Sequence, residues 1–343
     1  MLSKMNIFLK VISVLLLTLM MIGCGKKDEN NNPVGPDTNI KVRWEPTGII
    51  PYETNYTRIY ALAILSNNTV FAGGDCGVYR SANRGGTWTE INAGLSEPPV
   101  YPNIRSLAMN GNGHLIAGAS QIYKSTNQGD QWSVKNGDDY LDRINTIAYT
   151  SDQELFISAG WSGVYRSTDD GETWSPVNNG LDDLSVEAMV INPDNDVIYI
   201  GAADYEGNHI YRSENNGEAW VKIGSLETNI VTLAINASGH LFAGTGDGMF
   251  RSKDNGETWS AINDGFSWEP WVLSMLIIQD GSIFIGTTDG AFVSTDHGDT
   301  WKDVSVGFTE HVTAVLSLAI DSDGYLYAGT RFSGVFRSQS KVN

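Results

Sequence analysis

The sequence "YRSTDDGETWSPVN", residues 165–178, contains the short polar turn that decides the fold of this chain. Read alone, its acids Asp169, Asp170 and Glu172 suggest the first half of a calcium loop. Such a loop alternates oxygen ligands over about twelve residues and closes with a glutamate. Here Trp174 follows almost at once and no closing ligand is available. The stretch therefore does not predict a metal site.

The same turn occurs six times in the chain, and we call it the box turn. Its pattern is Ser, then Asp or Asn two residues later, Gly four residues later and Trp seven residues later. In the quoted copy these are Ser167, Asp169, Gly171 and Trp174, and the other copies begin at Ser81, Ser125, Ser213, Ser252 and Ser294. A catalytic centre is asymmetric and is not needed six times, whereas a turn that every structural unit makes is needed that often.

The residue types of the box turn favour a structural role. Short Ser, Asp and Asn side chains close turns by bonding nearby backbone amides, and the glycine can adopt a positive φ. Asn replaces Asp at Asn83, Asn127 and Asn215. Because charge is dispensable at this position, the sequence favours hydrogen bonding over ion binding.

Each box turn lies in a unit of short apolar segments. A β-prone run such as "GVYRS" from Gly77 precedes it, and a short run such as "WTEIN" from Trp88 follows it. Earlier in each unit come an apolar run and a hairpin, as in "TLAINASGHLFAG" from Thr232. Four short strands joined by tight turns, without a helical period, predict one blade of a β-propeller.

The spacing of the tryptophans gives the number of blades. Those of the six box turns are separated by 44, 42, 46, 39 and 42 residues, the period expected of four-stranded blades. The C-terminal "HVTAVLSLAIDSDGYLYAGTRFSGVFRSQ" supplies three strands, and the N-terminal "KVRWEPTG" reads as a lone fourth strand around Trp44. Joining them leaves no unpaired edge at the seam. We therefore predict an all-β, seven-bladed propeller over residues 41–343, closed by the N-terminal strand.

The repeated S-x-[DN]-x-G-x-[TQA]-W pattern resembles a known family. It is similar to the Asp-box, or BNR repeat, of sialidases, xyloglucan-degrading hydrolases, sortilin-type receptors and photosystem II assembly factor propellers. The resemblance covers nearly all of residues 41–338. It implies the propeller fold, but it does not identify a function, because one fold hosts many unrelated sites.

The acidity of the chain narrows the classes of partner. Its 40 Asp and Glu residues against 22 Lys and Arg give a formal net charge of -18. Nucleic-acid binding needs a basic patch that meets the phosphates. Since no run of basic residues occurs outside the N-terminal leader, we expect no nucleic-acid partner.

Residues 1–23 resemble the signal peptide of a bacterial lipoprotein. Lys4 and Lys10 precede the apolar run "VISVLLLTLMMI", which is short for a membrane anchor, the alternative reading. The "MIGC" at residues 21–24 resembles a lipobox, which implies lipidation of Cys24. Residues 24–40 read as a flexible polar tether, whose "KKDE" resembles a surface-export signal of Bacteroidetes-like lipoproteins. We expect a lipoprotein of the outer membrane or cell surface, attached to the membrane through its lipid only.

A propeller sorts its loops onto two faces. The box turns lie on one face, and the loops between second and third strands and between blades lie on the other, the mouth face, where the central channel opens. The aromatic residues that the repeat does not use are predicted on the mouth face: Trp161, Trp268, Trp271, Tyr52, Tyr56, Tyr101, Tyr140, Tyr205 and Phe332. Such residues suit stacking on sugars or gripping a protein, and packing between loops is the alternative.

The arginines likewise divide into those that the repeat uses and those that it does not. Those that directly precede a box turn are interpreted as scaffold, whereas Arg58, Arg105 and Arg143 begin the innermost strands of three successive blades and Arg331 lies in a loop of the closing blade. Several arginines at one rim could hold a carboxylate or another anion. The alternative is local ion pairing with Asp138, Asp139 or Asp142.

Motifs for catalysis are missing. A sialidase would bring an Arg-Ile-Pro motif, but Arg58 and Ile59 are followed by Tyr60. Glycoside hydrolysis needs two carboxylates at a set separation, and the sequence does not single out a pair. No nucleophile-elbow, phosphate-loop or H-E-x-x-H motif occurs, and no histidines have metal-ligand spacing. We therefore name no catalytic residue, metal or cofactor.

The leading hypothesis is a monomeric propeller that binds a protein or glycan partner through the mouth face. One alternative is a glycoside hydrolase or lyase that uses two acids on that face. Another is an assembly factor for a membrane protein complex. The first two place the site on the mouth face, and the third predicts a specific protein client.

Overall fold

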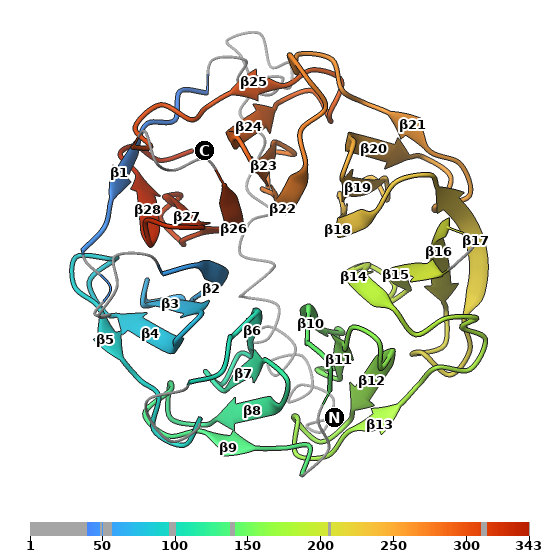
Figure 1. Ribbon diagram of the computed structural model, residues 1–343, viewed down its shortest axis with the longest axis horizontal. Coiled ribbons are helices and arrows are strands. Elements are labelled where there is room, and N and C mark those ends of the chain that lie inside the picture. Colours follow the sequence, from blue (N-terminus) through green and yellow to red (C-terminus); the bar gives the residue numbers. More distant parts are fainter. Residues whose placement is uncertain are drawn as a thin grey trace, which may run out of the picture. The chain divides into compact units, whose positions relative to one another are not determined.

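Short antiparallel strands account for the regular structure of the described residues in the computed structural model (Figure 1). The structure describes residues 40–48, 50, 57–95, 101–137, 141–204, 207–309 and 314–342. Within them no helix has the length and hydrophobicity that crossing a membrane requires. Residues 41–343 group into one unit by their contacts.

The described strands form seven sheets of four strands each, and we call these sheets blades 1 to 7. Blade 1 consists of β2 (Ile59–Ile64), β3 (Val70–Gly74), β4 (Gly77–Ser81) and β5 (Thr89–Glu90). Blade 2 consists of β6 (Ser106–Met109), β7 (Leu115–Gly118), β8 (Ile122–Ser125) and β9 (Ser133–Val134). Blade 3 consists of β10 (Thr146–Tyr149), β11 (Leu155–Ser158), β12 (Val164–Ser167) and β13 (Ser175–Pro176).

The later blades follow the same order from the channel outward (Figure 1). Blade 4 consists of β14 (Val186–Ile191), β15 (Ile198–Asp204), β16 (Gly207–Ser213) and β17 (Val221–Leu226). Blade 5 consists of β18 (Ile230–Ile235), β19 (Leu241–Thr245), β20 (Gly248–Ser252) and β21 (Ser260–Ala261). Blade 6 consists of β22 (Val272–Ile277), β23 (Ile283–Thr287), β24 (Gly290–Ser294) and β25 (Lys302–Asp303). Blade 7 consists of β26 (Val315–Ile320), β27 (Leu326–Thr330), β28 (Val335–Ser338) and β1 (Trp44–Pro46).

The two ends of the propeller sequence meet in blade 7. The N-terminal strand β1 pairs antiparallel with β28, with Trp44 opposite Ser338 and Pro46 opposite Phe336. Figure 1 shows β1, in blue, beside β28, in red. The predicted seven blades and the predicted closure by the N-terminal strand are confirmed. This pairing covers an edge of β28 that would otherwise be open to another strand.

The box turns are closed by hydrogen bonds among their own atoms. Ser167 Oγ donates to Asp169 Oδ1 at 2.8 Å and accepts from the Gly171 amide at 2.9 Å, while the Thr173 amide donates to Asp169 Oδ1 at 2.8 Å. The other five copies repeat these three bonds. Gly171 has a φ of 80°, and Asp170 before it also has a positive φ, of 59°. The sequence predicted the first of these left-handed residues but not the second.

Tryptophans of the box turns join neighbouring blades, but not all of them do so. Trp132 Nε1 donates to the carbonyl oxygen of Ile91 in the preceding blade at 2.7 Å. Trp220, Trp301 and Trp44 make the same contact across their own boundaries. Trp174 and Trp259 instead donate to the glycine carbonyl of their own turns, at 3.2 and 3.0 Å. Each tryptophan that joins two blades comes after a blade whose outer strand ends in a tight x-[NS]-x-G-[LF] turn. This turn places a backbone carbonyl of the preceding blade within reach of the indole.

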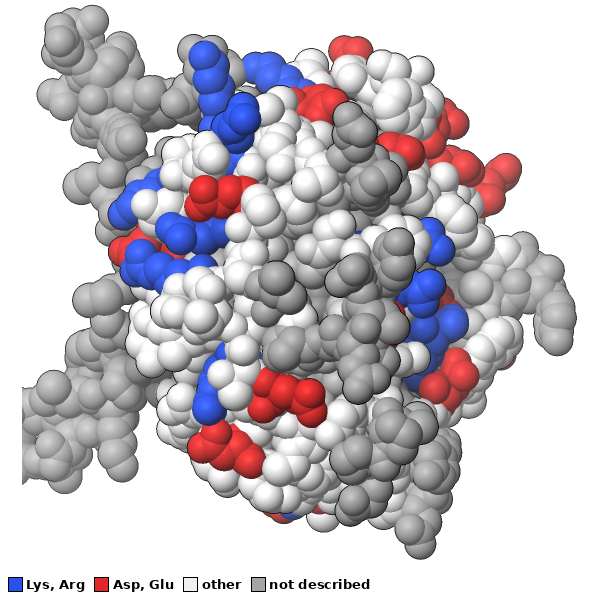
Figure 2. All heavy atoms as spheres, turned by 60° about the vertical axis from the view of Figure 1, so that its left-hand side comes forward, with Lys and Arg blue, Asp and Glu red and all other residues white. Residues whose placement is uncertain are grey.

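Cations before the box turns also link blades. Arg80 reaches Asp130 in the next box turn at 2.8 Å, and Arg251 reaches Asp299 at the same distance. The buried Lys124 makes the equivalent contact with Glu172 at 2.8 Å and a second contact with Asp170 at 2.9 Å. On the side of the molecule that Figure 2 shows, Lys and Arg side chains lie among Asp and Glu side chains. These contacts support the interpretation of such cations as scaffold.

Candidate functional site

The innermost strands of the seven blades enclose a central cavity of about 820 Å³. Side chains at equivalent positions of these strands form two rings around it. The mouth ring consists of Tyr60, Arg105, Asn145, Glu187, Val231, Leu273 and Leu316. The aliphatic ring, two residues further along each strand, consists of Leu62, Leu107, Ile147, Met189, Leu233, Met275 and Leu318. Because alternate residues of a strand share a face, both rings point into the channel, with the mouth ring nearer the mouth face.

A backbone irregularity places the mouth ring. In five blades the strand register shifts by one residue at this level, so that the mouth-ring residue has no partner on the second strand. The residues concerned are Tyr60, Glu187, Val231, Leu273 and Leu316. A β-bulge of this kind bends the strand and re-aims a side chain. The fold therefore supplies five positions at the mouth whose residues are left out of the strand pairing.

One part of the mouth ring is an aromatic and cationic pair. The Arg105 guanidinium lies 5.1 Å from the centre of the Tyr60 ring, a geometry that stabilises a cation over an aromatic face. The Tyr60 hydroxyl donates to Asp75 Oδ1 at 2.9 Å. Burial, with the nearby Asp75 carboxylate, raises the pKa of Tyr60 although Arg58 opposes the shift. Tyr60 therefore remains a neutral hydrogen-bonding group at physiological pH.

The neighbouring blades contribute a second polar group. Arg143 Nη2 lies 2.5 Å from Glu187 Oε1, and the Asn145 side chain donates to Glu187 Oε2 at 3.1 Å. Arg143 Nε is buried without a hydrogen-bond partner, and its distance to Asp142 Oδ2 is 3.8 Å. Among the described lining residues, Glu187 is the one carboxylate of the cavity. Its oxygens are already held by Arg143 and Asn145.

The remaining part of the mouth is mainly apolar. Blades 5 to 7 contribute Val231, Leu273 and Leu316 to the mouth ring. Trp271, whose surface is 48% exposed, lines the cavity immediately before β22. The mouth is thus amphipathic: blades 1 to 4 present hydrogen-bonding and charged groups, and blades 5 to 7 present mainly hydrocarbon, with Asn229 before β18 as a polar exception. Such a surface can hold one anionic or polar group and one apolar group of the same ligand.

The predicted contact residues divide into two groups. Arg105, Arg143 and Trp271 line the central cavity. Arg58 lies 4.0 Å from Asp75, and Arg331 lies over the Phe332 ring at 5.2 Å, and neither lines the cavity. Both belong to segments that enter or leave strands on the mouth face.

The predicted surface tryptophans lie on loops of the mouth face. Trp161, between β11 and β12, and Trp268, before β22, are 67% and 53% exposed. Both side chains are more exposed than those of the box-turn tryptophans, which pack within or between blades. Tyr205 and Cys24 lie outside the described residues, as do Tyr52, Tyr56 and Tyr140.

Sequence reasoning missed Glu187, the ion-pair partner of Arg143, and Asn145, which also bonds to Glu187. Glu187 and Asn145 come from different blades and follow no motif. An alignment of the first strands of all seven units would have placed Asn145 and Glu187 at the same strand position as Arg105. The acids considered as ion-pair partners of Arg143 were Asp138, Asp139 and Asp142; the first two lie outside the described residues, and Glu187 is closer than Asp142. Over the described part of the chain, no three His, Cys, Asp or Glu side chains gather as metal ligands would.

Comparisons with known proteins agree on the fold. Residues 144–270 match the family described as the DUF6242 beta propeller domain. A search of the curated proteins found no match. Among solved structures, the extracellular domain of BT4673, a one component system protein of B. thetaiotaomicron, has a TM-score of 0.69 at 15% identity over 88% of this chain. The present chain spans 40% of the length of that domain.

Two further solved structures match this chain over almost their entire length. YCF48 bound to D1 peptide has a TM-score of 0.66 at 17% identity, and the match covers 90% of this chain and 100% of that one. Virginiamycin B lyase from Staphylococcus aureus has a TM-score of 0.67 at 11% identity, over 88% of this chain and 99% of that one. These likenesses establish the fold, because at such identity unrelated functions share a fold.

Proposed function

We propose that this protein is an exported propeller that binds a segment of a partner protein at the mouth of its central cavity. The main support is the amphipathic mouth, which has Arg105 and Arg143 on one side and Trp271 and Leu273 on the other. A peptide that offers an acidic group and an apolar side chain would satisfy both sides. The peptide complex of YCF48 supports this proposal, because a propeller of the same fold is seen there with a bound peptide.

Site-specific photocrosslinking tests the proposal. A photoreactive benzoylphenylalanine in place of Trp271 would lie at the cavity mouth, and the same group in place of the exposed Thr89 on the outer strand β5 is the control. We expect the first variant, expressed in the organism of origin, to crosslink to a discrete protein partner. The additional change Arg143→Ala should reduce that product. Equal crosslinking from both positions would contradict a site at the mouth.

A glycan is the second candidate ligand. Exposed Trp161, Trp268 and Trp271 on one face favour it, since indole rings stack on sugars. A glycan array probed with the purified protein separates the two candidates. Binding that is lost in Trp161→Ala and Trp268→Ala but kept in Arg143→Ala would favour the glycan. The hydrolase alternative has less support, because two-carboxylate catalysis needs a second acid and Glu187 is the one acid among the described lining residues.

We further propose that the propeller belongs with the Asp-box proteins and is held at the cell surface by a lipid on Cys24. The repeated box turns support the first part, and the leader of residues 1–23 supports the second. A single Cys24→Ala change should release the protein from membranes or block its processing, since the acyl chains would supply the attachment. Protein that stays on membranes through salt and carbonate washes would contradict the lipid anchor.

A further inference from the structure

The charged side chains of the central cavity decide which ligands it attracts. Among the described lining residues these are Arg105, Arg143 and Glu187. Two positive charges and one negative charge leave the cavity with one excess positive charge, although the whole chain has a formal net charge of -18. A hollow whose charge is opposite in sign to that of the protein favours the entry of an anionic group.

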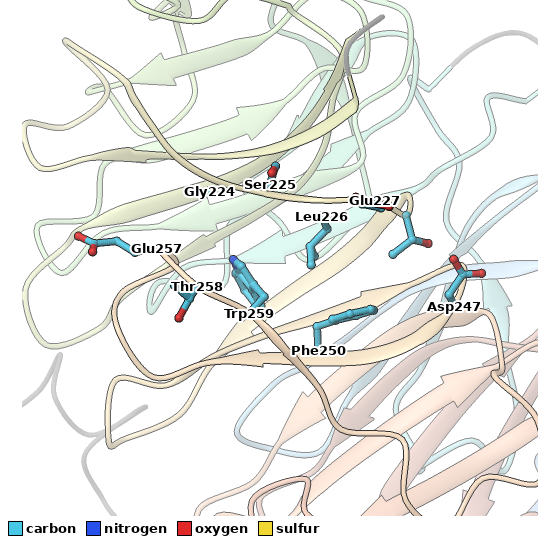
Figure 3. Close-up of a pocket in the computed structure, with 10 residues that line it drawn as sticks. Gly224, Ser225, Leu226, Glu227, Asp247, Phe250, Glu257, Thr258 and Trp259 are labelled. Atoms are coloured by element: carbon cyan, nitrogen blue, oxygen red, sulfur yellow. The ribbon is translucent and has the colours of Figure 1, made fainter.

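A second hollow provides the contrast. A groove of about 440 Å³ lies between β17 and blade 5 (Figure 3). Figure 3 shows Phe250 and Trp259 in its middle section, Glu227 and Asp247 at one end and Glu257 at the other. No Lys or Arg side chain is among its described lining residues. An acidic ligand would therefore be repelled by this groove and attracted by the central cavity.

Arg143 and Glu187 largely cancel each other's charge. Arg143 Nη2 lies 2.5 Å from Glu187 Oε1, and the Asn145 side chain donates to Glu187 Oε2 at 3.1 Å. An anion beside this pair would be attracted by the guanidinium and repelled by the carboxylate. Arg143 is therefore a poor binding residue for an acid on its own.

Arg105 has no such partner in the described part of the chain. None of the ion pairs there involves it, and no described group accepts a hydrogen bond from its guanidinium. This guanidinium lies 5.1 Å from the centre of the Tyr60 ring, which is itself held by the bond from its hydroxyl to Asp75 at 2.9 Å. A guanidinium that is positioned but not neutralised can give two parallel N–H bonds to a carboxylate.

Trp271 lies on the opposite side of the cavity from Arg105. Arg105 directly precedes β6 of blade 2, and Trp271 directly precedes β22 of blade 6. This is the largest separation that a ring of seven blades allows, and Figure 1 shows β6 and β22 across the central axis from each other. The Trp271 carbonyl accepts from the Thr288 amide at 3.1 Å, which holds the backbone that carries the exposed indole. A ligand that contacts both side chains must cross the cavity mouth.

We propose that the partner segment crosses the cavity mouth, with an acidic side chain on Arg105 and an apolar side chain against Trp271. Arg143 acts indirectly, because it neutralises Glu187 beside the bound acid. This inference rests on the proposed binding of a partner segment at the mouth. The acid is an Asp or Glu side chain, since a carboxylate matches the paired donors of a guanidinium. The acidic and the apolar residue of the segment are not adjacent, because their binding residues lie on opposite sides of the channel.

A displayed library of random dodecapeptides, selected on the full chain, is the probe. We expect the enriched peptides to carry one Asp or Glu and one large apolar residue with about three or more residues between them, because an extended chain rises only about 3.3 Å per residue. In a synthesised enriched peptide, moving the acid next to the apolar residue should weaken binding roughly tenfold, since the two contacts can then no longer form together. Titration calorimetry measures the affinities.

A double-mutant cycle tests the contact with Arg105. Arg105→Ala should weaken binding of the enriched peptide roughly tenfold or more. Replacing the acid of the peptide with its amide should do the same to the wild type but should have no further effect on Arg105→Ala, because both changes remove one contact. Arg105→Lys keeps the charge without the paired donors and should be intermediate. The control is the exposed Arg43 beside the outer strand β1, and Arg43→Ala should leave the affinity unchanged.

The indirect role of Arg143 predicts a rescue. Arg143→Ala should weaken binding because it leaves the charge of Glu187 uncovered beside the acid of the peptide. Adding Glu187→Gln should restore most of the affinity to Arg143→Ala but none to Arg105→Ala. A merely structural role of either arginine would not produce this difference. Melting curves of all variants confirm that the affinities refer to folded protein.

The outcomes separate this inference from the proposed function. Peptides that need Trp271 but bind Arg105→Ala as tightly as the wild type would overturn the inference and leave the peptide site in place. A loss of affinity in Arg143→Ala that Glu187→Gln does not restore would overturn the indirect role of Arg143. A selection that enriches no peptide dependent on Trp271 would contradict the proposed function, and this inference with it.

Discussion

Trp132 Nε1 donates a hydrogen bond of 2.7 Å to the carbonyl oxygen of Ile91, which lies in the preceding blade. The equivalent Trp174 donates to Gly171 in its own turn at 3.2 Å. Two identical sequence positions therefore have different structural roles. Trp132 joins two blades and is 2% exposed, whereas Trp174 is only half-buried. This difference leads to the first prediction.

Trp132→Ala should destabilise the propeller more than Trp174→Ala. Removing the buried indole should cost about 3 to 5 kcal/mol, and removing the half-buried one about 1 to 3 kcal/mol. Urea denaturation of the two variants measures the difference. Equal losses would mean that the blade-to-blade contact adds nothing to the packing of the ring.

Asp169→Asn should change stability by less than about 1 kcal/mol, because the turn needs an acceptor rather than a charge. Asn83 shows how the amide fits: its Oδ1 accepts from the Thr87 amide at 2.8 Å, and its Nδ2 donates to Thr87 Oγ1 at 3.1 Å. Asp169→Ala is the control and should cost about 1 to 3 kcal/mol, since it leaves the Thr173 amide without its acceptor. Thermal melting of both variants decides this. A large loss in the Asn variant would show that the carboxylate has a further role.

Acid should weaken the box turns that contain aspartate. Hydrogen bonds from the Thr173 side chain and amide lower the pKa of Asp169 to about 2, and the same contacts from Thr258 lower that of Asp254 to about 2. An unfolded aspartate has a pKa of about 3.9. The folded value is the lower one, so this stabilisation is complete above about pH 4 and is lost as the pH falls through about 2.

Replacing these two aspartates with asparagine should remove that part of the pH dependence. We expect the free energy of unfolding of the double variant to fall less steeply between pH 4 and pH 2 than that of the wild type. Denaturation at a series of pH values gives both slopes. Parallel curves would show that other carboxylates dominate the acid response.

Gly94→Ala should be strongly destabilising. Gly94 has a φ of 88°, and a Cβ there would lie 2.1 Å from the carbonyl oxygen of Trp132. Both the backbone strain and the clash oppose the substitution, for a loss of about 2 to 4 kcal/mol. Gly111, around which a Cβ would meet nothing within 4 Å, is the matched control. Gly111→Ala should change stability by less than about 1 kcal/mol, and similar melting temperatures for the two variants would contradict this account.

The sequence was sufficient for the fold because the information is local and repeated. Ser167, Asp169 and Gly171 form their turn with atoms that lie within four residues of one another, so the pattern of residue types fixes the geometry. Six copies at a regular spacing then give the blade, and the incomplete units at the two ends give the closure that β1 and β28 make.

The site depends on contacts that no local pattern contains. Arg143 and Glu187 belong to different blades and meet only when these neighbouring blades pack together. The bulges that aim Tyr60 and Leu273 into the cavity arise from a register shift between strands, which composition does not encode. The different contact of Trp259 likewise depends on the preceding blade, where β17 continues instead of turning.

The sequence by itself determined the seven blades, the box turns and the closure by the N-terminal strand. Tertiary structure alone decided which side chains surround the central cavity, which tryptophans join blades and where a groove stays open beside β17. The physical reason is the range of the interactions. Turn hydrogen bonds and strand alternation act between residues close in sequence, whereas the cavity and the groove are made by side chains from separate blades whose positions depend on the closed ring.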